Sequence, residues 1–234
     1  MMAIKGILFD KDGTLIDVNG TWVPFYKHLL AQELGANEQE AEVLMERAGY
    51  ERAGKRFLPG SVLASGTTQQ LVEIWWPDDT PSQQKRTGER LDRDYAPVAR
   101  SFLKPLFDLA PLLSELKHSG FFLGVGTNDS AISAMGHIEA LGVGDFFDVI
   151  IGADSVAVPK PSGHMVRFFA NSAGLSCAEV AMVGDNAHDM EEARNGGAGL
   201  AVAVLTGNSD REHVEHLADY VLDSVAGLPR LLKS

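Results

Sequence analysis

Two aspartates stand two residues apart in the segment Asp10-Lys11-Asp12-Gly13-Thr14, directly after the apolar run Ile7-Leu8-Phe9. A short apolar run of this kind predicts a buried strand, and Gly13 lets the backbone turn sharply around a ligand. The two carboxylates then lie at the carboxyl end of a strand, where open α/β sheets bind their ligands. There, one carboxylate can attack a substrate while the other transfers protons. Taken alone, the segment also fits an ordinary strand-ending turn with solvated acids.

Three further polar segments follow apolar runs later in the chain. They are Thr127-Asn128 after the run 121–125, Pro159-Lys160-Pro161 after the run 149–151, and Gly184-Asp185-Asn186-Ala187-His188-Asp189 after the run 180–183. Helical patterns lie between these runs, for example before Gly120 and Gly174. Because strands that alternate with helices form parallel sheets, the sequence predicts an α/β fold.

Together these four segments resemble the ordered motifs of the haloacid dehalogenase superfamily of phosphohydrolases. Those motifs are an Asp-x-Asp with Gly-Thr, a Ser or Thr, a Lys, and an acidic pair, and a set of four in order is far more specific than any one. The resemblance covers residues 3 to about 205 apart from roughly 17–103, and within the superfamily it is closest to phosphoglycolate phosphatase-like enzymes with a helical cap. It implies a doubly wound, Rossmann-like parallel-sheet core with an inserted all-helical cap domain.

The stretch 17–103 differs in character from the rest of the chain. It holds long polar and helical segments without a convincing strand, at 25–34, 38–48, 69–75 and 83–95. We therefore expect residues 1–16 and 104–234 to form the α/β core and residues 17–103 to form the cap, with hinges near 17–21 and 101–105. In the core we also expect strands at 200–205 and 220–222, a helix at 225–232, and a helix opened by a capping box from Ser209 to Glu212.

The resemblance implies a role for each motif residue. Asp10 would be the nucleophile that forms an aspartyl-phosphate, and Asp12 the general acid that protonates the leaving alkoxide and then activates water. Thr127 and Lys160 would bind the phosphoryl oxygens. Asn128 would either cap the helix that follows or orient the site.

A metal ion is implied as well, because carboxylates that face an anionic phosphate need a cation between them. Asp10 and Asp185 would supply carboxylate oxygens and Asp12 its backbone carbonyl, and such hard oxygen donors suit Mg²⁺. Asp189 would be a further ligand, either directly or, as is more common in the family, through water or as an outer ligand. Considered one at a time, Asp185 could instead cap a helix and Asp189 could be an ordinary acid in a first helical turn.

Composition excludes several classes of function. A formal net charge of -12 argues against a nucleic-acid surface, and the single Cys177 excludes an internal disulfide and fits a reducing compartment. No signal peptide and no run of about 18 apolar residues is visible, so we expect no membrane span and a cytoplasmic protein. The expected partner is a small phosphorylated molecule, bound by a monomer or a homodimer.

The sequence thus predicts an Mg²⁺-dependent phosphomonoester hydrolase that acts on a small, phosphoglycolate-like metabolite. A phosphomutase of the β-phosphoglucomutase type shares every motif and is one alternative; a non-catalytic binding module on the same fold is another. Asp12 argues against dehalogenation, which has no leaving alkoxide to protonate. Substrate choice is expected to come from the cap, first from the basic residues Arg47, Arg52, Lys55 and Arg56, and otherwise from Trp75-Trp76.

Overall fold

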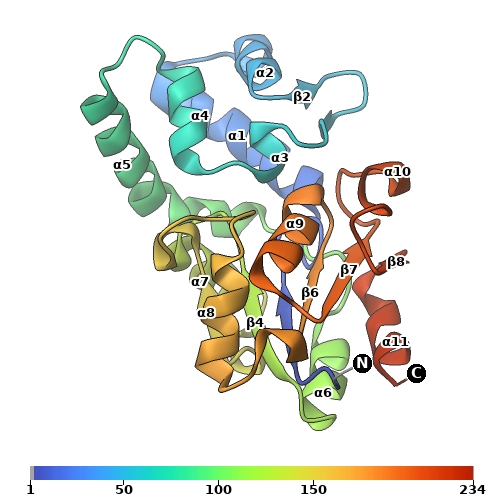
Figure 1. Cartoon of the computed structure of the whole chain (residues 1–234). Helices are drawn as coiled ribbons and strands as arrows, with labels where there is room; N and C mark the ends of the chain where they lie inside the picture. Colours follow the sequence, from blue (N-terminus) through green and yellow to red (C-terminus); the bar gives the residue numbers. More distant parts are fainter. Residues whose placement is uncertain (1–2, 234) are drawn as a thin grey trace.

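The computed structural model describes residues 3–233 and consists of an α/β core that carries a largely helical insert above one end (Figure 1). Residues 1, 2 and 234, which the predicted core boundaries include, lie outside the described residues. The core strands are β1 (Gly6–Phe9), β4 (Phe122–Gly126), β5 (Val149–Ile151), β6 (Val180–Gly184), β7 (Leu200–Val204) and β8 (Tyr220–Leu222). The core helices are α6 (Ala110–His118), α7 (Ala131–Ala140), α8 (His164–Ala173), α9 (Ala187–Gly196), α10 (Arg211–Val214) and α11 (Leu228–Leu232).

The six core strands form one parallel sheet in the order β5-β4-β1-β6-β7-β8. From β1 the chain builds one side of the sheet through β4 and β5, then crosses over to build the other side from β6 onward. Ligands of doubly wound sheets bind at this kind of switch point, beyond the carboxyl ends of the strands. The predicted fold class is therefore confirmed, with the switch located around β1.

Alternating side chains of β1 build the two halves of the core. Ile7 and Phe9 pack into the hydrophobic cluster that includes α6 and α11, whereas Leu8 packs into the cluster that includes α8 and α9. Side chains of a strand point to opposite faces in turn, so an uninterrupted apolar run is what a strand with helices on both faces requires. This requirement is why the apolar runs predicted the strands to within about one residue.

The insert has a hydrophobic cluster of its own, which runs from Val18 to Ala99. Its helices are α1 (Val18–Leu34), α2 (Glu38–Arg47), α3 (Val62–Ser65), α4 (Thr68–Trp75) and α5 (Pro81–Ala99). It also holds one antiparallel pair that the sequence did not predict, β2 (Tyr50–Glu51) with β3 (Arg56–Phe57). A strand of two residues is too short to show an alternating pattern.

The two chain segments that connect insert and core lie side by side. The backbone N–H of Asp17 donates to the carbonyl of Lys104 at 2.8 Å, and the N–H of Lys104 donates to the Thr21 hydroxyl at 3.0 Å. The side chain of Asp17 caps α1, so residues 18–21 are already helical. Hydrogen bonds thus tie together both segments that the sequence predicted as hinges.

One local prediction in the core was wrong. The helix expected to open with a Ser209–Glu212 capping box begins at Arg211 instead, its N-terminal flanking residue is Asp210, and no side chain caps it. Ser209 and Asn208 are buried in the loop that precedes the helix, since this loop packs against the site described below.

Among residues 3–233, no helix combines the length and the apolar character needed to cross a membrane.

Candidate active site

The carboxyl ends of the three central strands bring the first, second and fourth motifs together. In the sheet register Phe9 of β1 is level with Val125 of β4 and Val183 of β6. Asp10 follows Phe9 directly, while Thr127 and Asp185 each come one residue later in the neighbouring strands. The side chains of Asp10, Thr127 and Asp185 are all buried there.

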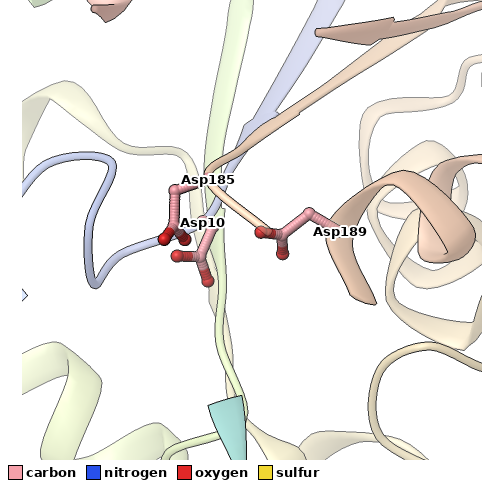
Figure 2. A group of neighbouring side chains, drawn as sticks. All are labelled: Asp10, Asp185 and Asp189. Atoms are coloured by element: carbon pink, nitrogen blue, oxygen red, sulfur yellow. The ribbon is translucent and has the colours of Figure 1, made fainter. Parts of the chain in front are cut away.

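Three buried carboxylates form the centre of the site. Oxygens of Asp10, Asp185 and Asp189 all lie within 4.8 Å of one another, and Figure 2 shows Asp189, on α9, pointing from the side toward the other two. Glycines make room for this cluster: a Cβ atom added to Gly13 or to Gly207 would overlap the Asp185 carboxylate. Gly13 also has a φ of +81°, a left-handed conformation that glycine adopts at little cost.

Lys160 reaches this cluster from the loop before α8. Its Nζ donates to Asp10 Oδ1 at 2.6 Å and to Asp189 Oδ1 at 2.7 Å, and its side chain is almost completely buried. Burial alone would lower the pKa of the ammonium, but the neighbouring Asp10 and Asp189 carboxylates outweigh it and hold that pKa above its usual range. Lys160 is therefore a fixed positive charge beside the potential nucleophile.

One lysine does not balance three carboxylates. Burial raises the pKa of Asp10 to about 6, with Lys160 opposing and Asp189 adding to the rise. Burial, together with the Asp10 and Asp189 charges, raises the pKa of Asp185 well above its usual range. A cation bound between the carboxylates would compensate these charges, and three hard oxygen donors this close fit a small divalent ion. The residues present therefore suit the metal that the sequence predicted.

Asp12 belongs to a second network, which the sequence analysis did not identify. The fully buried Lys11 ammonium pairs with Asp12 Oδ2 and, at 3.0 Å, with Asp129 Oδ2, and it lies 4.9 Å from the ring centroid of Trp22. The indole N–H of Trp22, on α1 of the insert, donates to Asp12 Oδ1. Asp12 is thus held from the core by Lys11 and from the insert by Trp22.

The pKa values of the two carboxyl groups in this network are shifted in opposite directions. Burial raises the pKa of Asp12 to about 6 against the opposing Lys11 charge, and Asp129 and Asp10 contribute to the rise. Burial also opposes ionisation of Asp129, but the charge of Lys11 and the neighbouring His137 outweigh it and lower the pKa of Asp129. The signal in the sequence was Lys11 itself, because a lysine that continues the buried alternation of β1 needs acidic partners.

The two residues of the second motif, Thr127 and Asn128, have different roles. Thr127 lines the cavity above Asp10, and its hydroxyl accepts from the N–H of Asp129 at 3.2 Å. Asn128 does not cap α7, because Ser130 does so. Instead Asn128 accepts from the Lys160 N–H at 3.1 Å and donates to the Ser65 carbonyl of the insert at 3.0 Å. The alternative in which Asn128 orients the site is the one this geometry favours.

A cavity of about 50 Å³ lies over these residues, between core and insert. The core contributes the motif side chains Asp10, Asp12, Thr127, Asn128, Lys160 and Asp189, and also His188. Asp185 is not among its lining residues. The insert contributes α1 side chains, among them Trp22 and Tyr26, and the segment 63–66.

The basic residues expected to set specificity lie elsewhere. Arg52 pairs with Glu42 at 3.0 Å and with Glu46 at 3.2 Å, and Arg56 pairs with Glu51 at 3.0 Å. None of the four residues Arg47, Arg52, Lys55 and Arg56 lines the cavity over Asp10. Acids nearby in the sequence thus pair with Arg52 and Arg56 within the insert itself.

Comparison with known proteins agrees with this geometry. A model of the haloacid dehalogenase-like hydrolase family matches residues 4–197. The chain belongs to this family. Phosphoglycolate phosphatase of Pectobacterium atrosepticum is 29% identical over 234 aligned residues, which span 99% of this chain and 94% of that protein. Pyrophosphatase PpaX of Bacillus velezensis is 26% identical over 227 residues, which span 96% of this chain and 94% of that protein.

A solved structure supports the same fold. The crystal structure of a predicted phosphoglycolate phosphatase from Haemophilus somnus superposes with a TM-score of 0.74 at 20% sequence identity, covering 99% of each chain. The family model and the phosphatase relatives together identify the chain as a haloacid dehalogenase-like phosphatase. Relatives of similar identity carry two different substrate names, phosphoglycolate phosphatase and pyrophosphatase.

Proposed function

We propose that the protein is an Mg²⁺-dependent phosphomonoester hydrolase that works through an aspartyl-phosphate on Asp10. One observation carries the proposal. Oxygens of Asp10, Asp185 and Asp189 lie within 4.8 Å of one another beside the Lys160 ammonium, at the carboxyl end of the sheet. Asp12 lines the same cavity as Asp10 and Lys160. A nucleophile, a cation site, a fixed positive charge and a proton donor are what transfer of a phosphoryl group to a carboxylate requires.

In the first step a carboxylate oxygen of Asp10 forms a bond to phosphorus while the bond from phosphorus to the ester oxygen breaks. The departing oxygen takes a proton from Asp12. In the second step water attacks the phosphorus, Asp12 takes a proton from that water, and the bond between Asp10 and phosphorus breaks. The pKa of Asp12, raised to about 6 mainly by burial, suits a group that must give and then accept a proton near neutral pH.

The phosphoryl group carries negative charge that must be balanced before a carboxylate can approach it. Lys160, fixed between Asp10 and Asp189, supplies one positive charge, and the Thr127 hydroxyl at the cavity wall supplies a hydrogen-bond donor. Asp10, Asp185 and Asp189, with the backbone carbonyl of Asp12, would hold Mg²⁺, which when bound neutralises phosphoryl charge and orients the transferring group.

The insert, residues 17–103, serves in this proposal as a cap that closes over the bound ester. In the insert, Trp22 contacts Asp12 and Ser65 contacts Asn128 of the core. Closure of the cap therefore positions the proton donor Asp12 and at the same time excludes water from the site. The small cavity favours a compact metabolite of about the size of 2-phosphoglycolate. A cytoplasmic location and a monomeric or homodimeric state remain predictions.

The proposal is tested by turnover of a panel of phosphomonoesters with Mg²⁺, including p-nitrophenyl phosphate, for the wild type and for Asp10→Asn. We expect release of inorganic phosphate by the wild type and a loss of at least about 10³-fold in the variant, whose amide is a poor nucleophile. Full activity of Asp10→Asn would contradict the covalent mechanism. Activity that depends on an added sugar bisphosphate would favour the phosphomutase alternative.

A further inference from the structure

A second cavity adjoins the one over Asp10 and extends into the insert between α1, α4 and α5. The two cavities share Trp22, Tyr26 and Asp129 as lining residues. An ester whose phosphoryl group lies over Asp10 would therefore direct its leaving group past Trp22 and Tyr26 into the second cavity. The chemistry of that cavity bears on the substrate of the enzyme, so the inference rests on the function proposed above.

The wall of the second cavity is aromatic and aliphatic with a small polar part. Five aromatic and five aliphatic side chains line it, together with the hydroxyls of Thr68 and Ser133. The charged residues on its lining are Asp92 and Asp129, both acidic. Over the described residues, neither cavity is lined by an Arg, and the one Lys on either lining is Lys160 at the phosphoryl site.

Of the two acidic residues that line this cavity, Asp92 on α5 is the one that has no cationic side chain as a partner among residues 3–233. Within residues 3–233 it forms no ion pair, and its Oδ1 accepts from the Thr68 hydroxyl at 2.6 Å. Burial raises the pKa of Asp92 to about 6, and the Asp129 charge adds to the rise. Asp129 has Lys11 as partner, but Lys11 is shared with Asp12. The cavity thus has an excess of negative charge in an apolar wall.

From this arrangement we infer that the preferred substrate is a short alkyl phosphate whose other end carries an ammonium group. A substrate carboxylate would meet Asp92 and Asp129 with no basic side chain to pair with, whereas an organic cation would be paired with Asp92 and surrounded by aromatic rings. The cavity volume of about 50 Å³ fits a small head group, because one water needs roughly 10–15 Å³ on such a measure. The substrate then resembles 2-phosphoglycolate in size but has the opposite charge at its far end.

The experiment compares kcat/KM for 2-aminoethyl phosphate and its N,N,N-trimethyl analogue with two matched esters. One is 3,3-dimethylbutyl phosphate, the neutral isostere of the trimethyl compound, and the other is 2-phosphoglycolate; p-nitrophenyl phosphate reports general activity. We expect at least one ammonium ester to exceed the neutral isostere by about tenfold or more and 2-phosphoglycolate by about a hundredfold. Equal values for the ammonium esters and the isostere, or a preference for 2-phosphoglycolate, would overturn the inference.

A variant then tests whether Asp92 causes the preference for the ammonium ester. Asp92→Asn keeps the acceptor for Thr68 and should lower kcat/KM for the preferred ammonium ester by about tenfold, with little change for the neutral isostere or for p-nitrophenyl phosphate. Asp94→Asn is the matched control, because Asp94 lies on the same helix but is exposed and pairs with Arg93. Equal losses on all esters in Asp92→Asn would show a structural role and contradict the assignment.

A binding measurement tests the preference for an ammonium ester independently of the proposed phosphatase activity. Calorimetric titration of the Asp10→Asn variant with the ammonium ester and with the neutral isostere measures the preference without turnover. Tighter binding of the ammonium ester supports the inference even if the wild type hydrolyses nothing. Equal binding would contradict it even if the wild type is an active phosphatase.

Discussion

Replacing Lys11 by methionine tests how the enzyme holds its proton donor. Lys11 is fully buried and pairs with Asp12 and Asp129, whose side chains are 18% and 27% exposed. Removing one partner of a buried ion pair costs about 3–5 kcal/mol, and we take about 3 kcal/mol because both carboxylates keep some contact with water. In a protein of this size that loss lowers the Tm by about 6–12 °C.

In the same variant, kcat should fall more for an alkyl phosphate than for p-nitrophenyl phosphate. A misplaced Asp12 protonates the leaving oxygen poorly, and alkoxides need that proton far more than p-nitrophenolate does. We therefore expect kcat to fall by about a hundredfold for an alkyl phosphate and by much less for p-nitrophenyl phosphate. Both rates are measured by phosphate release at a temperature well below the lowered Tm.

Two comparisons make this prediction refutable. Lys85→Met removes an exposed lysine whose pair with Glu89 spans 3.9 Å, and it should change stability by less than about 1 kcal/mol. Lys11→Met combined with Asp129→Asn should destabilise less than the sum of the single variants, because it leaves one buried carboxylate unpaired instead of two. An unchanged Tm, or equal losses of kcat on both esters, would show that Lys11 does not position Asp12.

Three further outcomes are expected. Excess chelator should abolish turnover and Mg²⁺ should restore it, while Ca²⁺, which takes more ligands, should inhibit; full activity in chelator would contradict the metal role of Asp185. Gly207→Ala should raise the Mg²⁺ concentration for half-maximal activity by about tenfold or more, because its Cβ would displace the Asp185 carboxylate, whereas Gly144→Ala, whose Cβ would make only ordinary van der Waals contact with Glu139, should not. Burial, with the Lys11 charge, lowers the pKa of His137 from 6.5 to about 3, so the unfolded chain binds a proton there that the folded protein does not. The free energy of unfolding should therefore fall between pH 6.5 and 5 by about 2 kcal/mol more in the wild type than in His137→Gln, and parallel pH curves would contradict this.

The sequence predicted the core of the site because the relevant signals are local. Each motif follows an apolar run, and in a parallel sheet the ends of such runs lie at one edge. This is why the sequence alone could place Asp10, Thr127 and Asp185 near one another. Their distances depend on the strand order, in which β1 lies between β4 and β6, and the motifs do not encode that order.

The contacts made by the insert could not be predicted in the same way. Trp22 reaches Asp12, and Asn128 reaches Ser65, only because the insert packs over the core, and no periodic pattern reports such long-range packing. The density of basic residues from Arg47 to Arg56 was misleading for the opposite reason. The acids that neutralise Arg52 and Arg56 are their own neighbours in the insert, so local charge balance explains those residues without a ligand.

The central claim is that the Asp10 carboxylate attacks phosphorus, and trapping the intermediate tests it most directly. The enzyme is mixed with Mg²⁺ and excess p-nitrophenyl phosphate, quenched in acid within the first turnovers, and treated with borohydride, which reduces an acyl phosphate to an alcohol. Peptide mass spectrometry should then find homoserine in place of Asp10, and none when substrate is omitted. Steady turnover with an unmodified Asp10, or with the reduced residue at another carboxylate, would contradict the account.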